Sequence, residues 1–586
     1  MNKEKIILGI HYGHDATVCL MINGEILEVM SEERLTRQKK HFGFPHEALL
    51  YIKQKYKIEN FSKIIMVGEE KHLGEYIFAS KEDNVNNRKN KVTPKHYLRS
   101  LGFRFYILGK IIKIRDGFIK IKFKNNEEKI KKYLKDIFPN SEISYLNHHL
   151  AHAYAAIPFF SNYEKRIILT LDGQGDNMSG SVNLYKDGQV EVVSKIEAKS
   201  SIGLLYCAIV DVLGMTRNEH EFKVMGLAPY AKVSSGEIVY EKLKKLVWVN
   251  KKNLTVESSF DLSKATEYLI ANEYYNYRFD SLSYGIQKIC EEVMIDLAKA
   301  SIEKLNCNQI AIGGGVFMNV KGNQKINELK EVQDFTVSPS CGDESLAIGA
   351  VMFGFLQENS IKGFKKPDNI YWGSEYTDEN IKRDIDIFAF SNEVNVAYFD
   401  PSQDKKIESR VAEILSKNGV VGRFKGRAEW GARALGNRSI LANPSSRDNV
   451  KLINEMIKNR DFWMPFATSI LVERADKYLY RKENFSAPFM AITFETKPEA
   501  HKNLEAALHP YDLTSRPQMV DVRANPEYHF LISEFENLTS IGGVLNTSFN
   551  LHGEPNVEKP YDALRTFDLS GLPNLAIGNY LISKTK

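Results

Sequence analysis

The chain has little cysteine and no pair of cysteines spaced to bind zinc or to form a redox motif. The five cysteines are scattered and odd in number, which favours a reduced, cytoplasmic protein over a disulfide-bonded secreted one. The first residues lead directly into a strand pattern and not into a signal peptide. The cysteines are Cys19, Cys207, Cys290, Cys307 and Cys341.

Long apolar runs and a strong excess of charge are also missing. No hydrophobic stretch is long enough to span a membrane, so we expect no membrane partner. The net charge of +5 is small for 586 residues and gives no support for a nucleic-acid partner, and it leaves phosphorylated small molecules open as ligands. The pattern G-x-x-x-x-G-K-[ST] is absent, which excludes a P-loop. The length exceeds one hydrophobic core and predicts two or more domains.

One strand pattern occurs twice, at residues 5–30 and 166–193. Each copy has an apolar strand, a polar turn containing glycine, a second strand, a hairpin (Asn23-Gly24 or Asp187-Gly188) and a third strand. In this comparison His11 corresponds to Asp172, and Asp15 to Asp176. Such a duplication predicts an α/β fold of the actin-like kind, in which the two turns face each other across a cleft and hold nucleotide phosphates.

The stretch N-H-H-L-A-H-A at 147–153 predicts a helix with two histidines on one face. His148 and His152 are four residues apart, a spacing at which two imidazoles can bind one divalent metal ion. Asp172 follows an apolar strand and adds a carboxylate. The alternative is that a histidine caps the helix or fills a gap in the core. Asp343, in C-G-D-E-S, is either the N-cap of the next helix or a further carboxylate at the metal.

Glycines mark two further segments. Residues 309–319 read as a strand, three glycines and a helix start, where exposed backbone can approach a phosphate or an adenosine. Residues 221–231 contain Gly226 and Pro229 and predict a loop. Between the repeats, residues 70–135 are rich in Lys, Asn and Arg and are interpreted as an insertion with a solvated face, helical around 127–138.

Arginine dominates the part of the chain after a polar stretch at 357–400. Cations stand among glycines and small polar residues there, a combination suited to bidentate binding of oxyanions. The alternative is that each cation lies at the surface in its own salt bridge. The candidates are Arg423, Arg427, Arg433, Arg438, Lys458, Arg460 and Arg516, with Asn546 in a nearby turn.

These residues resemble the O-carbamoyltransferase family of antibiotic and nodulation-factor biosynthesis, almost from end to end. The matching stretches, in order, are G-H-D-A-T, S-E-E-R-L-T-R, N-H-H-L-A-H-A, L-D-G-Q-G-D, E-F-K-V-M-G-L-A-P-Y, G-G-G-V-F-M-N, C-G-D-E-S, G-R-A-E-W-G-A-R-A-L-G-N-R-S-I and N-T-S-F-N-L-H-G-E-P.

The resemblance implies an actin-like domain at 1–365, a linker at 366–400 and a YrdC-like α/β domain at 401–586. In the family, the YrdC-like domain makes carbamoyl adenylate from carbamoyl phosphate and ATP, with Mg²⁺ accompanying the ATP. The first domain then transfers the carbamoyl group to a hydroxyl of a small-molecule or sugar acceptor. Oligomerisation stays possible. We place the acceptor wall near Glu32–Lys40 and in the 70–135 insertion.

The resemblance also implies roles for individual residues. His14, which directly precedes Asp15 in H-D-A-T, is the expected base on the acceptor hydroxyl. The implied ligands of a divalent metal, usually Fe²⁺, are His148, His152, Asp172 and Asp343. The implied nucleotide contacts are Asp15, Gly173, Gly175, Asp176, Lys223, Gly313, Gly314, Gly315 and Asn319. The implied carbamoyl-phosphate contacts are Arg427, Arg433, Arg438, Lys458, Arg460, Arg516, Asn546 and Ser548, of which Arg433, Lys458, Arg516 and Ser548 are expected to be catalytic.

Two other functions stay open on the sequence. A small-molecule kinase would use Asp15 or Asp176 as a base and would release ADP, but it leaves the arginine-rich part unexplained. A nucleotide-dependent binding module or tRNA-modification partner is opposed by the modest charge.

Overall fold

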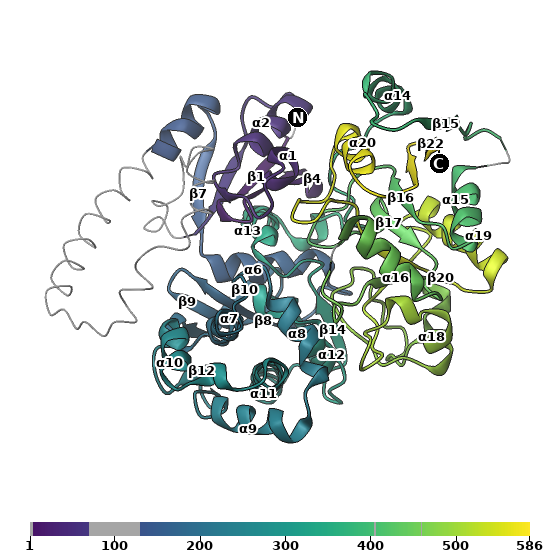
Figure 1. Cartoon of the computed structure of the whole chain (residues 1–586). Coiled ribbons are helices and arrows are strands. Elements are labelled where there is room, and N and C mark those ends of the chain that lie inside the picture. Colours follow the sequence, from purple (N-terminus) through teal and green to yellow (C-terminus); the bar gives the residue numbers. More distant parts are fainter. Residues whose placement is uncertain (1–3, 69–128, 404–405, 459, 586) are drawn as a thin grey trace, which may run out of the picture.

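The computed structural model describes residues 4–68, 129–403, 406–458 and 460–585 (Figure 1). Most of the basic stretch predicted as an insertion lies outside these residues, although 129–137 are helical as expected. No helix within the described ranges is long and apolar enough to cross a membrane. All five cysteines are buried and unpaired.

Two five-stranded sheets with the same strand order confirm the predicted repeat and the α/β class. In each, an antiparallel meander of three strands continues into two parallel strands. The first sheet runs β4 (Glu25–Ser31), β3 (Thr17–Ile22), β1 (Ile6–His11), β6 (Lys63–Val67) and β7 (Glu142–Leu146). The second runs β10 (Gln189–Glu197), β9 (Met178–Lys186), β8 (Arg166–Gly175), β13 (Gln309–Gly313) and β14 (Asp334–Val337).

The two polar turns share a backbone feature. Asp15 and Asp176, which the sequence comparison aligned, both have left-handed φ angles, +57° and +49°. The second turn is shorter than predicted, because β8 continues to Gly175 through an irregular register after Leu171. Asp172 therefore lies inside this irregular part of the strand, where its side chain can leave the sheet.

Helix α13 (Leu346–Leu356) is wholly apolar and packs between β1 and α6 (His148–Ala156). Two glycines permit this contact. A Cβ atom on Gly9 of β1 would lie 2.1 Å from the carbonyl oxygen of Ala347, and one on Gly349 of α13 would lie 1.9 Å from that of Ala151. The helix turn that carries Asp343 is thereby held against α6.

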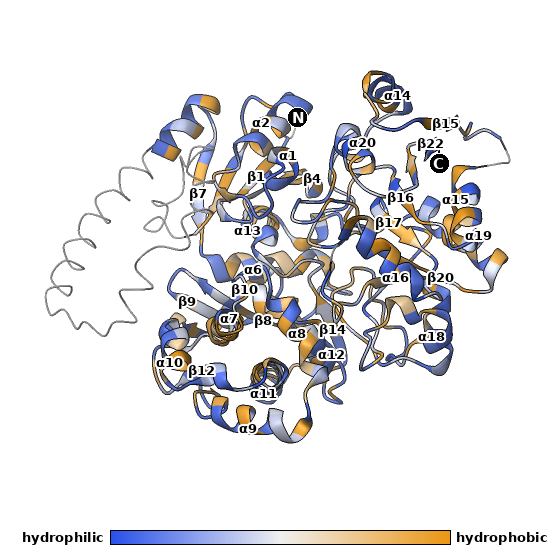
Figure 2. Ribbon diagram, viewed as in Figure 1, coloured by the Kyte–Doolittle hydropathy of each residue, from blue (hydrophilic) through white to orange (hydrophobic). Residues whose placement is uncertain are grey.

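The remaining helices of this part surround the two sheets. Figure 2 shows hydrophobic residues on α7 and α11, which pack against each other and against β8. We call residues 4–356 the first lobe. Its other helices are α1 (Glu32–Thr36), α2 (His46–Tyr56), α7 (Ile202–Val212), α8 (Glu221–Leu227), α9 (Val233–Leu243), α10 (Ala265–Ala271), α11 (Phe279–Leu305) and α12 (Val320–Asn327).

The predicted loop at 221–231 is wrong, because the chain forms α8 and a following 3₁₀ turn there. Gly226 is a helical residue. A Cβ on it would lie 3.4 Å from Met464 Sδ, and its carbonyl oxygen accepts a hydrogen bond from His509 Nε2 at 2.8 Å. The glycine thus serves close packing against distant parts of the chain and does not break the helix.

One eight-stranded sheet, green to yellow in Figure 1, forms what we call the second lobe, residues 378–585. Its edge strand β15 lies within the stretch predicted as a linker. Its order is β15 (Val394–Tyr398), β22 (Tyr580–Lys584), β21 (Asn574–Ile577), β16 (Val421–Phe424), β17 (Arg438–Ala442), β20 (Gly543–Ser548), β18 (Ala467–Leu471) and β19 (Pro517–Val520). The main helices are α14 (Asp378–Ile387), α15 (Ile407–Ser416), α16 (Asp448–Ile453), α18 (Pro498–Asn503), α19 (Pro526–Thr539) and α20 (Pro560–Asp568).

Candidate active site

Helix α6 presents two of the predicted metal ligands on one face. Asn147 caps the helix by accepting hydrogen bonds from two backbone N–H groups of the first turn. The carboxylate of Asp176 accepts the backbone N–H of His148 at 2.7 Å. Because these groups have no partner inside the helix, the two caps fix its first turn, and with it the direction in which His148 and His152 point.

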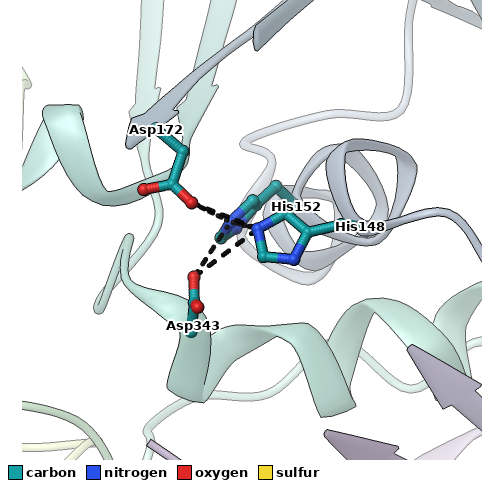
Figure 3. A group of neighbouring side chains, drawn as sticks. All are labelled: His148, His152, Asp172 and Asp343. Atoms are coloured by element: carbon teal, nitrogen blue, oxygen red, sulfur yellow. Dashed lines mark hydrogen bonds and ion pairs between the residues drawn. The ribbon is translucent and has the colours of Figure 1, made fainter. Parts of the chain in front are cut away.

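Figure 3 shows His148, His152, Asp172 and Asp343 converging, and their ligand atoms all lie within 4.8 Å of one another. The two imidazole Nε2 atoms are 3.2 Å apart. Asp172 Oδ2 lies 3.1 Å from His148 Nε2 and 3.6 Å from His152 Nε2. Asp343 Oδ1 lies 3.6 Å and 3.4 Å from the same two nitrogens.

Of the two alternatives for Asp343, the structure favours a place in this group. The residue lies in a 3₁₀ turn that precedes α13, and its side chain makes no capping hydrogen bond. The second oxygen of Asp172 accepts the backbone N–H of Gly315 at 3.2 Å. This contact leaves Asp172 Oδ2 directed at the imidazoles.

Because these four side chains are close together and largely buried, their charges shift one another's pKa values. Burial opposes protonation of His152, but hydrogen bonds and charge from Asp172 and Asp343 raise its pKa to about 9. Burial and the neighbouring Asp172 act to raise the pKa of Asp343, yet the histidines lower it to about 2. Two carboxylates whose pKa values are lowered are therefore enclosed with two imidazoles whose Nε2 atoms face each other, and a proton on His152 or a bound cation balances the carboxylate charge.

These residues fit a divalent metal ion. Imidazole nitrogens and carboxylate oxygens form a ligand set that suits Fe²⁺, Mn²⁺ or Zn²⁺. The converging lone pairs supply the directionality that such an ion requires.

The two histidines of the first polar turn differ in exposure and in pKa. His11 is buried, its Nε2–H donates to the carbonyl oxygen of His14 at 2.8 Å, and burial lowers its pKa to about 4. His14 is partly exposed, and its Nδ1 lies 2.7 Å from Asp15 Oδ2. Burial acts to lower the pKa of His14, but the hydrogen bond and charge of Asp15 raise it to about 9. His14 is therefore the histidine that can meet a ligand.

The glycines predicted to contact nucleotide lie around the same group. A Cβ on Gly175 would lie 2.3 Å from the His148 ring, and one on Gly313 would lie 2.9 Å from the His152 carbonyl oxygen. Gly314 has φ +95°, and Gly173 borders open space. Gly175 and Gly313 keep the backbone close to the imidazoles, and the backbone at Gly173 is open to a ligand.

Two other predicted nucleotide contacts are engaged within the protein. Asn319 caps α12 by accepting the backbone N–H of Gly322 at 3.0 Å. Lys223 forms an ion pair with Asp461 of the second lobe at 2.8 Å.

The second lobe contains a group of buried cations that lower one another's pKa values. The pKa of Arg516 lies well below its ordinary value because of burial and then the charges of Arg433 and Arg460. Burial and Arg433 lower the pKa of Arg460 to about 10. Burial, followed by the charges of Arg460 and Lys39, lowers the pKa of Lys458. We call Arg433, Lys458, Arg460 and Arg516 the cation group.

Lys458 and Arg460 donate hydrogen bonds to neutral oxygens. Lys458 Nζ donates to Ser548 Oγ at 3.1 Å and to Asn550 Oδ1 at 2.8 Å, and Arg460 donates to Thr547 Oγ1 at 2.9 Å. Among the residues that the structure describes, no carboxylate forms an ion pair with any of the four cations. An anion bound here would supply the missing countercharge.

Three other residues predicted to bind carbamoyl phosphate are engaged elsewhere. Arg427 donates to the carbonyl oxygen of Leu27 at 2.7 Å and so joins the two lobes. Arg438 is fully buried, donates to backbone carbonyls, and lies 3.7 Å from the ring centre of Phe424. Asn546 donates to a hydroxyl inside the sheet. The structure does not bring these three into the cation group.

The cation group and the four-ligand group adjoin at Asp343-Glu344. Asp343 faces the imidazoles, whereas the Glu344 carboxylate accepts a hydrogen bond from Ser340 and acts on the pKa of Arg433. Burial, with the charge of Asp15 adding to it, raises the pKa of Glu344 to about 7. Two neighbouring residues therefore connect the two candidate sites.

Sequence reasoning gave three residues near these groups no role in either site, although Lys39 and Lys40 fall in the predicted acceptor wall. The charge of Lys39 lowers the pKa of Lys458, and the charge of Lys40 acts to lower the pKa of His14. Asn550 accepts a hydrogen bond from Lys458. The basic pair after S-E-E-R-L-T-R was the available signal for the lysines. Glu32, placed in the acceptor wall, instead accepts backbone N–H groups at the start of α2, at 2.8 and 3.0 Å.

Family comparison covers most of the chain. The family model described as carbamoyltransferase N-terminus matches residues 6–352, and the one described as carbamoyltransferase C-terminus matches residues 412–584.

Similar proteins come from several organisms. An uncharacterised protein of Methanocaldococcus jannaschii is 30% identical over 99% of both chains. The nodulation protein NolNO of Sinorhizobium fredii is 27% identical over 97% of this chain and 79% of its own. The 3'-hydroxymethylcephem-O-carbamoyltransferase of Streptomyces clavuligerus is 26% identical over 46% of this chain and 47% of its own.

Proposed function

The chain belongs to the carbamoyltransferase family and is a transferase, and from this premise we propose that it uses ATP to move a carbamoyl group from carbamoyl phosphate to a hydroxyl. Residues 401–586 would form carbamoyl adenylate. Residues 1–365 would transfer the carbamoyl group to a small-molecule or sugar acceptor. The observation that carries this proposal is the cation group, in which no cation forms a close ion pair with a carboxylate of the described residues and Glu344 is the acidic residue that acts on Arg433.

The cation group suits the first step. Carbamoyl phosphate is a small dianion, and guanidinium groups can hold its phosphate while the bond to the carbamoyl carbon breaks. Water attacks the carbamoyl carbon and inorganic phosphate leaves, which gives carbamate. Carbamate then attacks the α-phosphorus of ATP, which reaches the site with Mg²⁺, and pyrophosphate leaves. Lys458 and Ser548 lie 3.1 Å apart and can donate to the phosphoryl oxygens together.

The first lobe suits the second step. A divalent metal, which we propose to be Fe²⁺, would be held by His148, His152, Asp172 and Asp343, and when bound it supplies Lewis acidity and positive charge for a phosphate. Gly173 leaves the backbone open beside this group, which favours the approach of a nucleotide.

His14 is placed to move the proton of the acceptor. Asp15 holds its Nδ1 at 2.7 Å, so the other ring nitrogen, Nε2, can take a proton from the acceptor hydroxyl as that oxygen attacks the carbamoyl carbon and AMP leaves. The pKa of about 9 means that the ring must first lose a proton at neutral pH.

The test needs no acceptor. Protein, ATP, Mg²⁺ and carbamoyl phosphate are mixed, and pyrophosphate and nucleotide products are separated by chromatography. Pyrophosphate release that requires carbamoyl phosphate, is lost in Arg433→Ala, and is retained in the surface control Arg410→Ala would support the proposal. ADP release, or no turnover with metal supplied, would contradict it.

A further inference from the structure

Arg37, the last residue of S-E-E-R-L-T-R, reaches from the first lobe into the second. It follows α1 with a left-handed φ of +59°. Its guanidinium donates to two successive backbone carbonyls, that of Pro555 at 2.8 Å and that of Asn556 at 2.6 Å. The carboxylates of Glu554 and Asp562 lie 3.9 and 3.7 Å away. Arg37 thus holds the backbone of a segment more than 500 residues distant in sequence.

An amide side chain links this segment to the cation group. Asn550 donates from Nδ2 to the carbonyl oxygen of Glu554 at 2.8 Å. Asn550 Oδ1 accepts from Lys458 Nζ at 2.8 Å and from Ser548 Oγ at 2.6 Å. We call residues 549–558, which join Arg37 to Asn550, the brace loop.

Lys458 depends on these contacts for its direction. The residue is 4% exposed, and its ammonium donates to Ser548 and Asn550. His552 of the brace loop also contacts the Lys458 backbone, Nδ1 to carbonyl oxygen at 2.9 Å. A shift of the brace loop would therefore move both the ammonium and the backbone of Lys458.

We propose that Arg37 is a positioning residue for adenylate formation, which fixes the brace loop and through Asn550 aims Lys458. This inference rests on the proposed function. An arginine suits the task because its planar fork fixes the direction of the two N–H donors, whereas the ammonium of a lysine is a point charge on a flexible stem. The first lobe would then contribute to the reaction of the second without touching its substrate.

The first experiment measures order in the brace loop and needs no turnover. Hydrogen–deuterium exchange of residues 549–558 is compared in wild type, Arg37→Ala and Arg37→Lys. Arg37→Ala should raise exchange by about tenfold or more, because the loop loses two hydrogen bonds to a charged donor. The exchange rate in Arg37→Lys should lie between those of wild type and Arg37→Ala.

Lys482→Ala is the matched control. Lys482 also donates across the lobe border to two backbone carbonyls, those of Leu329 at 3.0 Å and Val332 at 2.7 Å, but does not touch the brace loop. Its loss should leave exchange at 549–558 unchanged. Equal exchange in Arg37→Ala and wild type, or an equal rise in Lys482→Ala, would overturn the inference.

The second experiment measures KM for carbamoyl phosphate in pyrophosphate release. Arg37→Ala should raise KM by about tenfold to a hundredfold, as expected for a misplaced binding group, with partial rescue in Arg37→Lys. The double variant with Asn550→Ala should show much less than the product of the two single effects, because both act on Lys458. Multiplicative effects, or an unchanged KM in Arg37→Ala, would overturn the inference. Absence of pyrophosphate release in the wild type would refute the proposed function. The hydrogen–deuterium exchange data would still show whether Arg37 orders the brace loop.

Discussion

At the scale of single residues, the two candidate sites differ in the sign of the charge that they enclose. In the first lobe two carboxylates face two imidazoles, and in the second lobe four cations act on one another, of which Lys458 and Arg460 donate to neutral oxygens. Enclosed charges of one sign are costly unless a ligand compensates them. A cation at the first site and an anion at the second would each lower this cost.

The titration of His14 gives the first residue-scale prediction. Asp15 raises its pKa to about 9, so the ring of the wild type should titrate near pH 9 in NMR spectra of ¹³C-histidine-labelled protein. Asp15→Asn should move the midpoint towards 6.5, because the charge that holds the proton is gone. The resonance is assigned by its loss in His14→Asn.

Two pH effects follow with definite signs. The unprotonated ring is the base, so carbamoyl transfer should rise with pH and level off above about 9. Because the folded-state pKa is raised, the His14–Asp15 pair stabilises the fold fully below the unfolded value near 6.5 and loses this effect as pH rises through about 9. A midpoint near 6.5 in the wild type would contradict both.

Metal content gives the second residue-scale prediction. Wild type should retain about one divalent ion per chain after dialysis, measured by mass spectrometry of the metal. His152→Ala should weaken retention by more than about tenfold to a hundredfold, the loss typical of even an outer metal partner. His501→Ala, which removes a histidine of the second lobe, is the control. Equal metal content in wild type and His152→Ala would count against this site.

The sequence predicted part of this residue-scale picture. A four-residue spacing identified His148 and His152, because helix geometry alone places them on one face. The residues of the arginine-rich part were harder to sort. Arg433 and Arg438 look alike in sequence, yet one faces the cation group and the other is buried against Phe424. Arg433 lies in the bend before β17, whereas Arg438 is the first residue of that strand, and the sequence does not state where the strand begins.

At the scale of elements, glycines decide how closely the backbone segments pack. The repeat was readable from sequence because strand periodicity and the Asn-Gly and Asp-Gly hairpins are local signals. The helix α8 was missed because Gly226 was taken as a breaker. Its purpose, contact with Met464 of the second lobe, depends on residues more than 200 positions away.

Gly349 provides the element-scale prediction. A Cβ there would lie 1.9 Å from the Ala151 carbonyl oxygen, so Gly349→Ala must push α13 away from α6. We expect a loss of about 1–3 kcal/mol in the free energy of unfolding. Metal retention should also fall, since Asp343 precedes α13 and the histidines lie on α6. Denaturant unfolding measures the first effect.

Gly363→Ala is the control for this change. Its Cβ would meet only the Phe355 ring, at 3.5 Å, which is an ordinary contact. Equal stability in the two variants would show that the packing of α13 on α6 is not as tight as the structure has it.

At the scale of the whole molecule, the two candidate sites lie in different lobes and meet at Asp343-Glu344. The duplicated sheets account for the first lobe, and the eight-stranded sheet carries Ser548 at the end of β20. Composition and length predicted more than one domain, but the contact between the sites came only with the structure. Because the sites are separate, a single substitution can abolish adenylate formation or carbamoyl transfer and leave the other step intact.

The most direct test of this division is the exchange of labelled pyrophosphate into ATP in the presence of carbamoyl phosphate. The exchange reports reversible formation of carbamoyl adenylate and needs no acceptor. We predict exchange in wild type and in His14→Asn, and none in Arg433→Ala. Loss of exchange in a folded His14→Asn, or exchange that persists in Arg433→Ala, would contradict the assignment of the two steps to two lobes.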